Sequence, residues 1–108
     1  MSGPLSPEEI LKFKAEVTPK FVYEAINELI AETINNSTAS FLFKVARLRI
    51  SDKMTHLAEF RNTEFSDRVA IIDTRGWLNV ENAYRAKGWN VTTDKTDEGI
   101  GFFVFKGD

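Results

Sequence analysis

Few side chains in this sequence have the types and spacing that catalysis or metal binding requires. The chain has one histidine, His56, and no cysteine, so thiolate sites are excluded and a histidine site would need carboxylate partners. No glycine-rich phosphate-binding motif occurs. Acidic residues gather at Glu8–Glu9, at Glu28 and Glu32, and at Asp94, Asp97 and Glu98. These positions fit a helix start, a solvated helix stripe and a hairpin tip. We therefore expect a non-enzymatic protein with no catalytic residue, metal site or cofactor.

A basic stretch between residues 44 and 61 is the clearest charged feature. It has five cations, including Arg61, against Asp52 and Glu59, or +3 in a chain whose net charge is −2. In a helix, Arg49, Lys53 and His56 would fall on one stripe that could contact phosphates. A solvated helix face is the alternative interpretation. The candidate nucleic-acid-binding residues are Lys44, Arg47, Arg49, Lys53, Arg75, Arg85 and Lys87.

Aromatic residues near the C-terminus supply a second candidate surface. Trp77, Tyr84 and Trp89 could stack on bases or anchor a protein partner, although their spacing favours core packing. The last strand carries apolar residues on both faces, so one face must pack on helices and the other needs cover. The candidate partner-binding residues are Trp77, Phe103 and Phe105.

These side chains must be positioned by a mainly helical first part of the chain. The segment from Ser6 to Glu9 predicts the start of a first helix, which Thr18-Pro19 ends. Apolar residues then recur at helical spacing from Phe21 to Ile34, followed by a polar turn at residues 35–37. Residues 39–43 predict a short strand. Residues 44–57 have helical spacing, with a strand over residues 41–50 as the competing interpretation.

The second part of the chain predicts a loop, two helical segments and a hairpin. The loop covers residues 62–66, and a buried helical turn or two follows at residues 69–72. Residues 77–87 predict a last helix, which Gly88 would end in a left-handed conformation with Trp89 packed back on Tyr84. Residues 89–94 and 100–105 then predict the two strands of a hairpin with a charged loop.

Together these elements predict one α+β domain over residues 1–108, with residues 1–5 flexible. It has four or five helices, a C-terminal β-hairpin and a short third strand, in the order of a winged helix. In nucleic-acid-binding winged helices, the helix before the wing commonly enters the major groove. No apolar run reaches the roughly 20 residues of a membrane span, and residues 1–4 lack a signal-peptide profile. We therefore expect a cytoplasmic protein without membrane contact.

Two segments resemble small uncharacterised accessory proteins of tailed bacteriophages. They are residues 21–30, FVYEAINELI, and residues 77–91, WLNVENAYRAKGWNV. In those proteins a helix that ends in Gly-Trp likewise leads into a C-terminal hairpin. The resemblance covers about a quarter of the chain. It implies a phage accessory protein in the cytoplasm of a bacterial host cell, and it carries over no activity and no functional residue.

Three hypotheses of function follow from these patterns. The leading hypothesis is a regulatory or accessory protein that contacts nucleic acid through a winged-helix-like domain. The second is an inhibitor or adaptor that captures a host protein. The third is a homo-oligomeric structural protein, in the simplest form a homodimer.

Overall fold

The computed structural model describes Pro4, Ser6, Pro7 and residues 18–107. Most of the first helix predicted from Ser6 onward, and most of residues 1–5, for which flexibility was predicted, lie outside the described residues. In the described part, the chain forms α2 (Lys20–Thr33), β1 (Thr38–Leu42), α3 (Phe43–Met54), a 3-10 turn η1 (Ala58–Phe60), α4 (Phe65–Thr74), α5 (Glu81–Arg85), β2 (Asn90–Lys95) and β3 (Gly101–Lys106). The α+β class, the C-terminal hairpin and the third strand predicted from the sequence are confirmed. No helix of this described part has the length and apolar character needed to cross a membrane.

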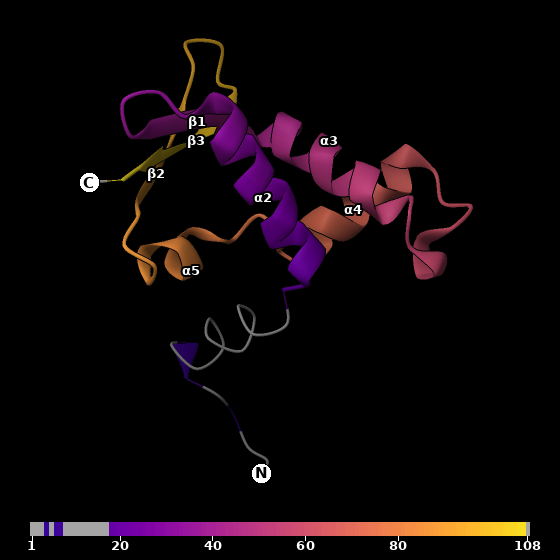
Figure 1. Cartoon of the computed structure of the whole chain (residues 1–108). Coiled ribbons are helices and arrows are strands. Elements are labelled where there is room, and N and C mark those ends of the chain that lie inside the picture. The colour runs from indigo at the N-terminus through magenta and orange to yellow at the C-terminus, as the bar shows by residue number, and fades with distance from the viewer. Residues whose placement is uncertain (1–3, 5, 8–17, 108) are drawn as a thin grey trace.

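The amphipathic helix α2 supplies one wall of the core and leads directly into the sheet. Its buried residues are Val22, Ala25, Ile26, Leu29 and Ile30, at the helical spacing expected from the sequence. After the helix, Asn36 and Ser37 take positive φ angles of 50° and 69°. Two hydrogen bonds between Asn35 and Thr38 close this turn. The tight reversal places β1 against α2, and Figure 1 shows α2 running diagonally up to the sheet.

The antiparallel sheet has the strand order β1–β3–β2, so the last strand of the chain lies at its centre. In the register, Phe41 is opposite Phe103, and Ala39 and Val91 flank Phe105 on either side. Because alternate residues of a strand share one face, these residues line the face that packs on the helices. The opposite face carries Leu42, Phe102 and Val104, all half-buried. The prediction that β3 is apolar on both faces is therefore confirmed.

Both edges of the sheet are partly closed by the chain's own hydrogen bonds. On β1, the N–H and C=O of Thr38 are bonded to Asn35. On β2, the Arg85 guanidinium donates to the Val91 carbonyl oxygen at 2.7 Å, and the Asp94 carboxylate accepts from the Lys95 N–H at 2.8 Å. Backbone groups of alternate residues point to the same side of an antiparallel strand. One edge-facing group near each end of β2 is therefore bonded within the chain.

Helix α3 decides between the two interpretations of residues 41–50. The strand ends at Leu42 and the helix begins at Phe43, so the helical prediction is confirmed and the strand interpretation is wrong beyond Leu42. Ala46, Ile50 and Met54 are fully buried along one side of the helix. The helix ends at Met54, so the exposed His56 lies beyond it and does not continue the stripe of Arg49 and Lys53.

The last predicted helix is shorter than expected, because a turn extends to residue 78 and residues 79–80 have no regular secondary structure. Trp77 donates its N–H to the Ile72 carbonyl, and Asn79 donates to that of Gly76. Trp77 is only 3% exposed and packs edge-on against Phe21, at 5.2 Å between ring centroids. Trp77 is buried although it lies in a turn, so its spacing to the buried Val80 and Tyr84 resembles that of a helix. The prediction of a helix over residues 77–87 is therefore wrong outside Glu81–Arg85.

The end of α5 has the geometry that the sequence predicts. Gly88 has a φ of +98°, and its N–H donates to the Arg85 carbonyl at 3.1 Å. The Trp89 N–H donates to the Tyr84 carbonyl at 3.1 Å, which completes a Schellman ending. The ring of Trp89 makes its edge contact with Phe105, at 6.3 Å between centroids, rather than with Tyr84. The predicted turn is confirmed, and its aromatic partner is corrected.

The other predicted segments differ from the structure only in detail. The loop expected at residues 62–66 lies at residues 61–64, because α4 begins at Phe65. Of the apolar run at residues 69–72, Ile72 is fully buried, whereas Ala70 is exposed. α4 therefore rests on the core through one side rather than through the whole run.

Candidate binding sites

Two basic side chains of α3, Arg49 and Lys53, face carboxylates on α2. The Arg49 guanidinium lies 2.7 Å from each carboxylate oxygen of Glu32, and its Nη1 lies 3.1 Å from Glu28 Oε1. Lys53 Nζ donates to Glu28 Oε2 at 2.6 Å. We call these four residues the α2–α3 ion-pair network. It joins the basic stripe predicted to contact phosphates to the acidic stripe predicted on the second helix.

Hydrogen bonds within the ion-pair network favour the charged forms of Glu28, Glu32 and Arg49. Hydrogen bonds from Lys53 and then Arg49 lower the pKa of Glu28, and a hydrogen bond from Arg49 lowers that of Glu32. Glu32 in turn raises the pKa of Arg49. The side chains are between 23% and 54% exposed, so solvent screens each pair and its effect on stability is small. A phosphate that approached Arg49 or Lys53 would also meet the negative charge of Glu28 and Glu32 at hydrogen-bond distance from these cations.

The other basic candidates are distributed over several elements. Arg47 Nε donates to Asp73 Oδ1 at 2.8 Å, and the Arg75 guanidinium lies 5.5 Å from the centre of the Trp77 ring. Arg85 is bonded to the Val91 carbonyl, while Lys44 and Lys87 are exposed. Across α2 to α4, three carboxylates pair with the +3 stretch of residues 44–61. The surface that carries the basic stripe is therefore close to neutral.

The aromatic residues nominated for partner contact lie in the core. Trp77, Phe103 and Phe105 are 3%, 1% and 0% exposed, so they offer almost no surface to a partner. Residues 103 and 105 share the face that packs on the helices, whereas Phe102 and Val104 point the other way. The accessible aromatic side chain of β3 is thus Phe102, which corrects the candidates drawn from the sequence.

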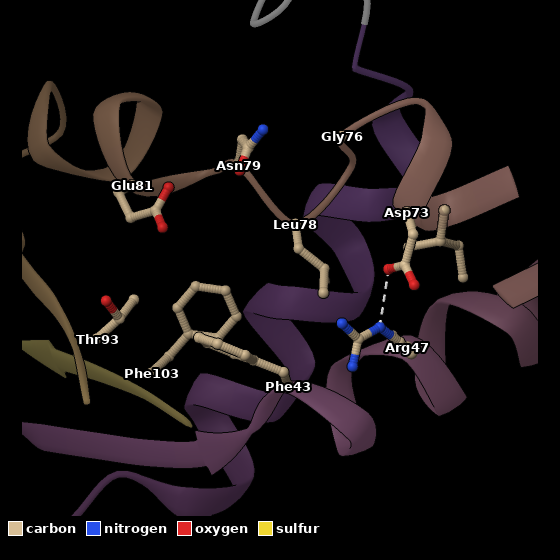
Figure 2. A pocket seen from close by; sticks show the side chains of 10 residues that line it. Phe43, Arg47, Asp73, Gly76, Leu78, Asn79, Glu81, Thr93 and Phe103 are labelled. Carbon is tan, nitrogen blue, oxygen red and sulfur yellow. Dashed lines mark hydrogen bonds and ion pairs between the residues drawn. The ribbon is translucent and has the colours of Figure 1, made fainter. Parts of the chain in front are cut away.

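A cleft of about 300 Å³ opens between the start of α3, the connection from α4 to α5, and the hairpin. We call it the Phe43 cleft. Its aromatic floor is the Phe43 ring set edge-on to Phe103, with 4.6 Å between centroids. Figure 2 shows Leu78 reaching toward these two rings from the other side. The ring of Phe43 lies over Gly101, where a Cβ atom would come within 2.5 Å of two ring carbons.

Charged side chains stand at the two ends of the Phe43 cleft (Figure 2). At one end Arg47 and Asp73 form their ion pair. At the other end, beside Thr93, stands Glu81, which has no ion pair with any residue of the described part. This site has no signal in the sequence, because its walls come from segments far apart in the chain. Glu81 alone carries no signal, since acidic residues are common in the first turn of a helix.

A second hollow of about 270 Å³ lies between α2 and α5 and includes Tyr23 and Lys87 in its lining. The Tyr84 hydroxyl donates to Asn27 Oδ1 at 2.6 Å and also lies 3.3 Å from the Tyr23 carbonyl oxygen. Burial, with a smaller contribution from Tyr23, raises the pKa of Tyr84 well above its usual value. This hydroxyl ties α5 to α2 and so fixes the helix on which Glu81 stands.

Comparisons with known proteins add no assignment to this geometry. The chain matches no known protein family, no curated protein and no solved structure.

Proposed function

We propose that this chain is a non-enzymatic accessory domain of phage type that binds another protein as an inhibitor or adaptor. The α2–α3 ion-pair network is the observation that carries the proposal. Nucleic-acid binding depends on cations that neutralise phosphates and release counterions. Arg49 and Lys53, the centre of the basic stripe, already neutralise Glu28 and Glu32. The surface that would have to attract phosphates therefore has little charge left for them.

The hairpin tip supports the same conclusion. The wings of nucleic-acid-binding winged helices contact the phosphate backbone of the nucleic acid. A basic wing tip would favour that contact. Here the exposed tip carries Asp94, Asp97 and Glu98 against Lys95. Its net negative charge repels phosphates and favours a basic protein surface.

Nucleic-acid binding remains the second candidate because of the order of the elements. A helix, a short strand, further helices and a hairpin follow one another, and β1 pairs with β3. This arrangement is compatible with a winged helix. The helix directly before the hairpin, however, is the five-residue α5, which spans only about 7.5 Å and presents little surface to a major groove.

Fluorescence anisotropy with labelled duplex DNA, single-stranded DNA and RNA separates the two candidates. We expect the wild type to bind none of them appreciably, even near 50 mM salt. The double variant E28Q/E32Q frees Arg49 and Lys53 and should gain sequence-independent binding. With two phosphates neutralised, that binding should weaken about tenfold between roughly 50 and 200 mM salt.

The control for this experiment is the double variant R49E/K53E, which removes the same cations. Wild-type binding at low salt that disappears in R49E/K53E would refute the proposal in favour of nucleic-acid binding. A photo-crosslinking residue placed at Thr93, and at the exposed Thr55 as a matched control, tests the protein partner in a bacterial cell. One defined protein adduct from position 93 and none from position 55 is the expected result.

A further inference from the structure

We infer that the Phe43 cleft receives an arginine side chain of the partner, with the guanidinium at Glu81 and the methylene groups over Phe43. This inference rests on the proposed function, since it names the chemistry of the partner's contact residue. Three properties of the cleft carry it: its unpaired charge, its aromatic floor and the net negative charge of its surroundings.

The charge of the cleft selects a cation. Arg47 and Asp73 balance each other at 2.8 Å, so Glu81 supplies the unbalanced charge among the described side chains of the lining. Thr93 stands beside it (Figure 2) and adds a hydroxyl that can accept a hydrogen bond. A guanidinium placed there would form a charge-assisted hydrogen bond with the Glu81 carboxylate, and such bonds are about twice as strong as neutral ones.

The floor of the cleft selects an amphipathic side chain over a small ion. Phe43 and Leu78 are half-buried and leave an apolar surface between the polar ends. Arginine buries its methylene groups on such surfaces while its planar head remains at the polar end. Its guanidinium also stacks on aromatic rings more often than a lysine ammonium does. Glu81 and Phe43 therefore suit arginine better than lysine.

The surroundings of the cleft disfavour a nucleotide. An adjoining hollow shares Phe43 and Thr93 with the cleft and adds Asp94 and Lys95. The two hollows together carry three carboxylates, Asp73, Glu81 and Asp94, against Arg47 and Lys95. A base that stacked on Phe43 would bring its phosphate into this net negative field. The same field attracts a basic segment of a protein.

The experiment is a titration of the ¹⁵N-labelled protein, followed by NMR, with small probes of one shape. Nα-acetyl-argininamide should shift the amides of residues 76–81 and 93–95. Nα-acetyl-citrullinamide, its neutral analogue, should bind about tenfold more weakly, because it lacks one charge-assisted interaction. The variant Glu81→Gln should lose this preference, while the matched exposed variant Glu59→Gln should keep it. Nα-acetyl-lysinamide should bind between the two.

Each other outcome overturns the inference. Equal binding of the arginine and citrulline probes would show that charge does not select the ligand. Unchanged preference in Glu81→Gln, or shifts confined to other surfaces, would place the arginine site elsewhere. Tighter binding of thymidine monophosphate at the same amides would make the cleft a base-binding site. A protein adduct at position 93 without any response to the arginine probe refutes this inference alone, whereas salt-dependent binding of nucleic acid by the wild type refutes the proposed function.

Discussion

Tyr84→Phe removes one hydroxyl from the contact between α2 and α5 and leaves the aromatic packing in place. Tyr84 is 7% exposed, and its ring contacts Phe105 edge-on at 5.2 Å between centroids. The variant keeps that ring and therefore creates no large cavity. It loses the hydrogen bond to Asn27 Oδ1. At neutral pH we expect a loss of about 1 to 1.5 kcal/mol in the free energy of unfolding, which is typical of one buried hydrogen bond.

Alkaline pH should remove most of this difference, because the pKa of Tyr84 is raised in the folded protein. Below a pH of about 10, the pKa of a tyrosine in the unfolded protein, Tyr84 is protonated in both the folded and the unfolded state. The contribution of its hydroxyl to the free energy of unfolding is then fully present. Above that value the unfolded state releases the proton and the folded state retains it, so stability falls with rising pH. By about pH 11 the wild type should have lost roughly 1.4 kcal/mol through this group. The Phe variant lacks that loss, so the two proteins should become nearly equal in stability.

Urea unfolding followed by tryptophan fluorescence at several pH values measures both effects. A double-mutant cycle with Asn27→Ala should give a coupling energy near 1 kcal/mol at neutral pH. The reasoning fails if the stability difference between wild type and Tyr84→Phe is the same at neutral pH and at about pH 11. It also fails if Tyr84 and Asn27 are energetically independent.

Three further variants test the fold and the ion-pair network. Gly88→Ala should lower the free energy of unfolding by roughly 1 kcal/mol in urea, because the positive φ of 98° rather than any clash excludes other residues. Gly101→Ala should lose about 1 to 3 kcal/mol and move the amide signals of the Phe43 cleft, since its Cβ would displace the Phe43 ring. Glu28→Gln should reduce the loss of stability that the wild type shows in acid. Because the pKa of Glu28 is lowered in the folded protein, the ionised carboxylate stabilises the fold above its usual pKa of 4.5, and this contribution is lost as the pH falls below that value. An unchanged acid limb in thermal melts would contradict that role of Lys53 and Arg49.

Local patterns predicted the parts of the fold that depend on near neighbours. The spacing of Ile26 and Ile30 marked α2, and the Gly88-Trp89 pair marked the end of α5, because both depend on residues within one or two turns. The helix predicted from Trp77 failed for the opposite reason. Trp77 is buried by Phe21, which is far from it in the sequence, and such burial imitates helical spacing without a helix.

The candidate sites were harder to predict because they depend on pairing across the chain. Arg49 is 17 residues from Glu32, and Lys53 is 25 residues from Glu28, so their mutual neutralisation has no local signal. No local signal shows whether Phe102 or Phe103 is the more exposed residue either, since both faces of β3 are apolar. Only the position of α2 and the register of β1 decide which face is covered.

The partly closed sheet edges determine how copies of this protein can associate. Continuous β-structure between molecules needs an open row of backbone groups to serve as a template. Here Arg85 and Asp94 bond one edge-facing group near each end of β2, and the Asn35 turn bonds one end of β1. In the middle of each edge, the edge-facing groups of Ser40 and Thr93 have no hydrogen-bond partner among the described residues. A strand from another copy could therefore pair with a short central stretch, whereas continuous pairing along a whole edge would first have to break the hydrogen bonds at its ends.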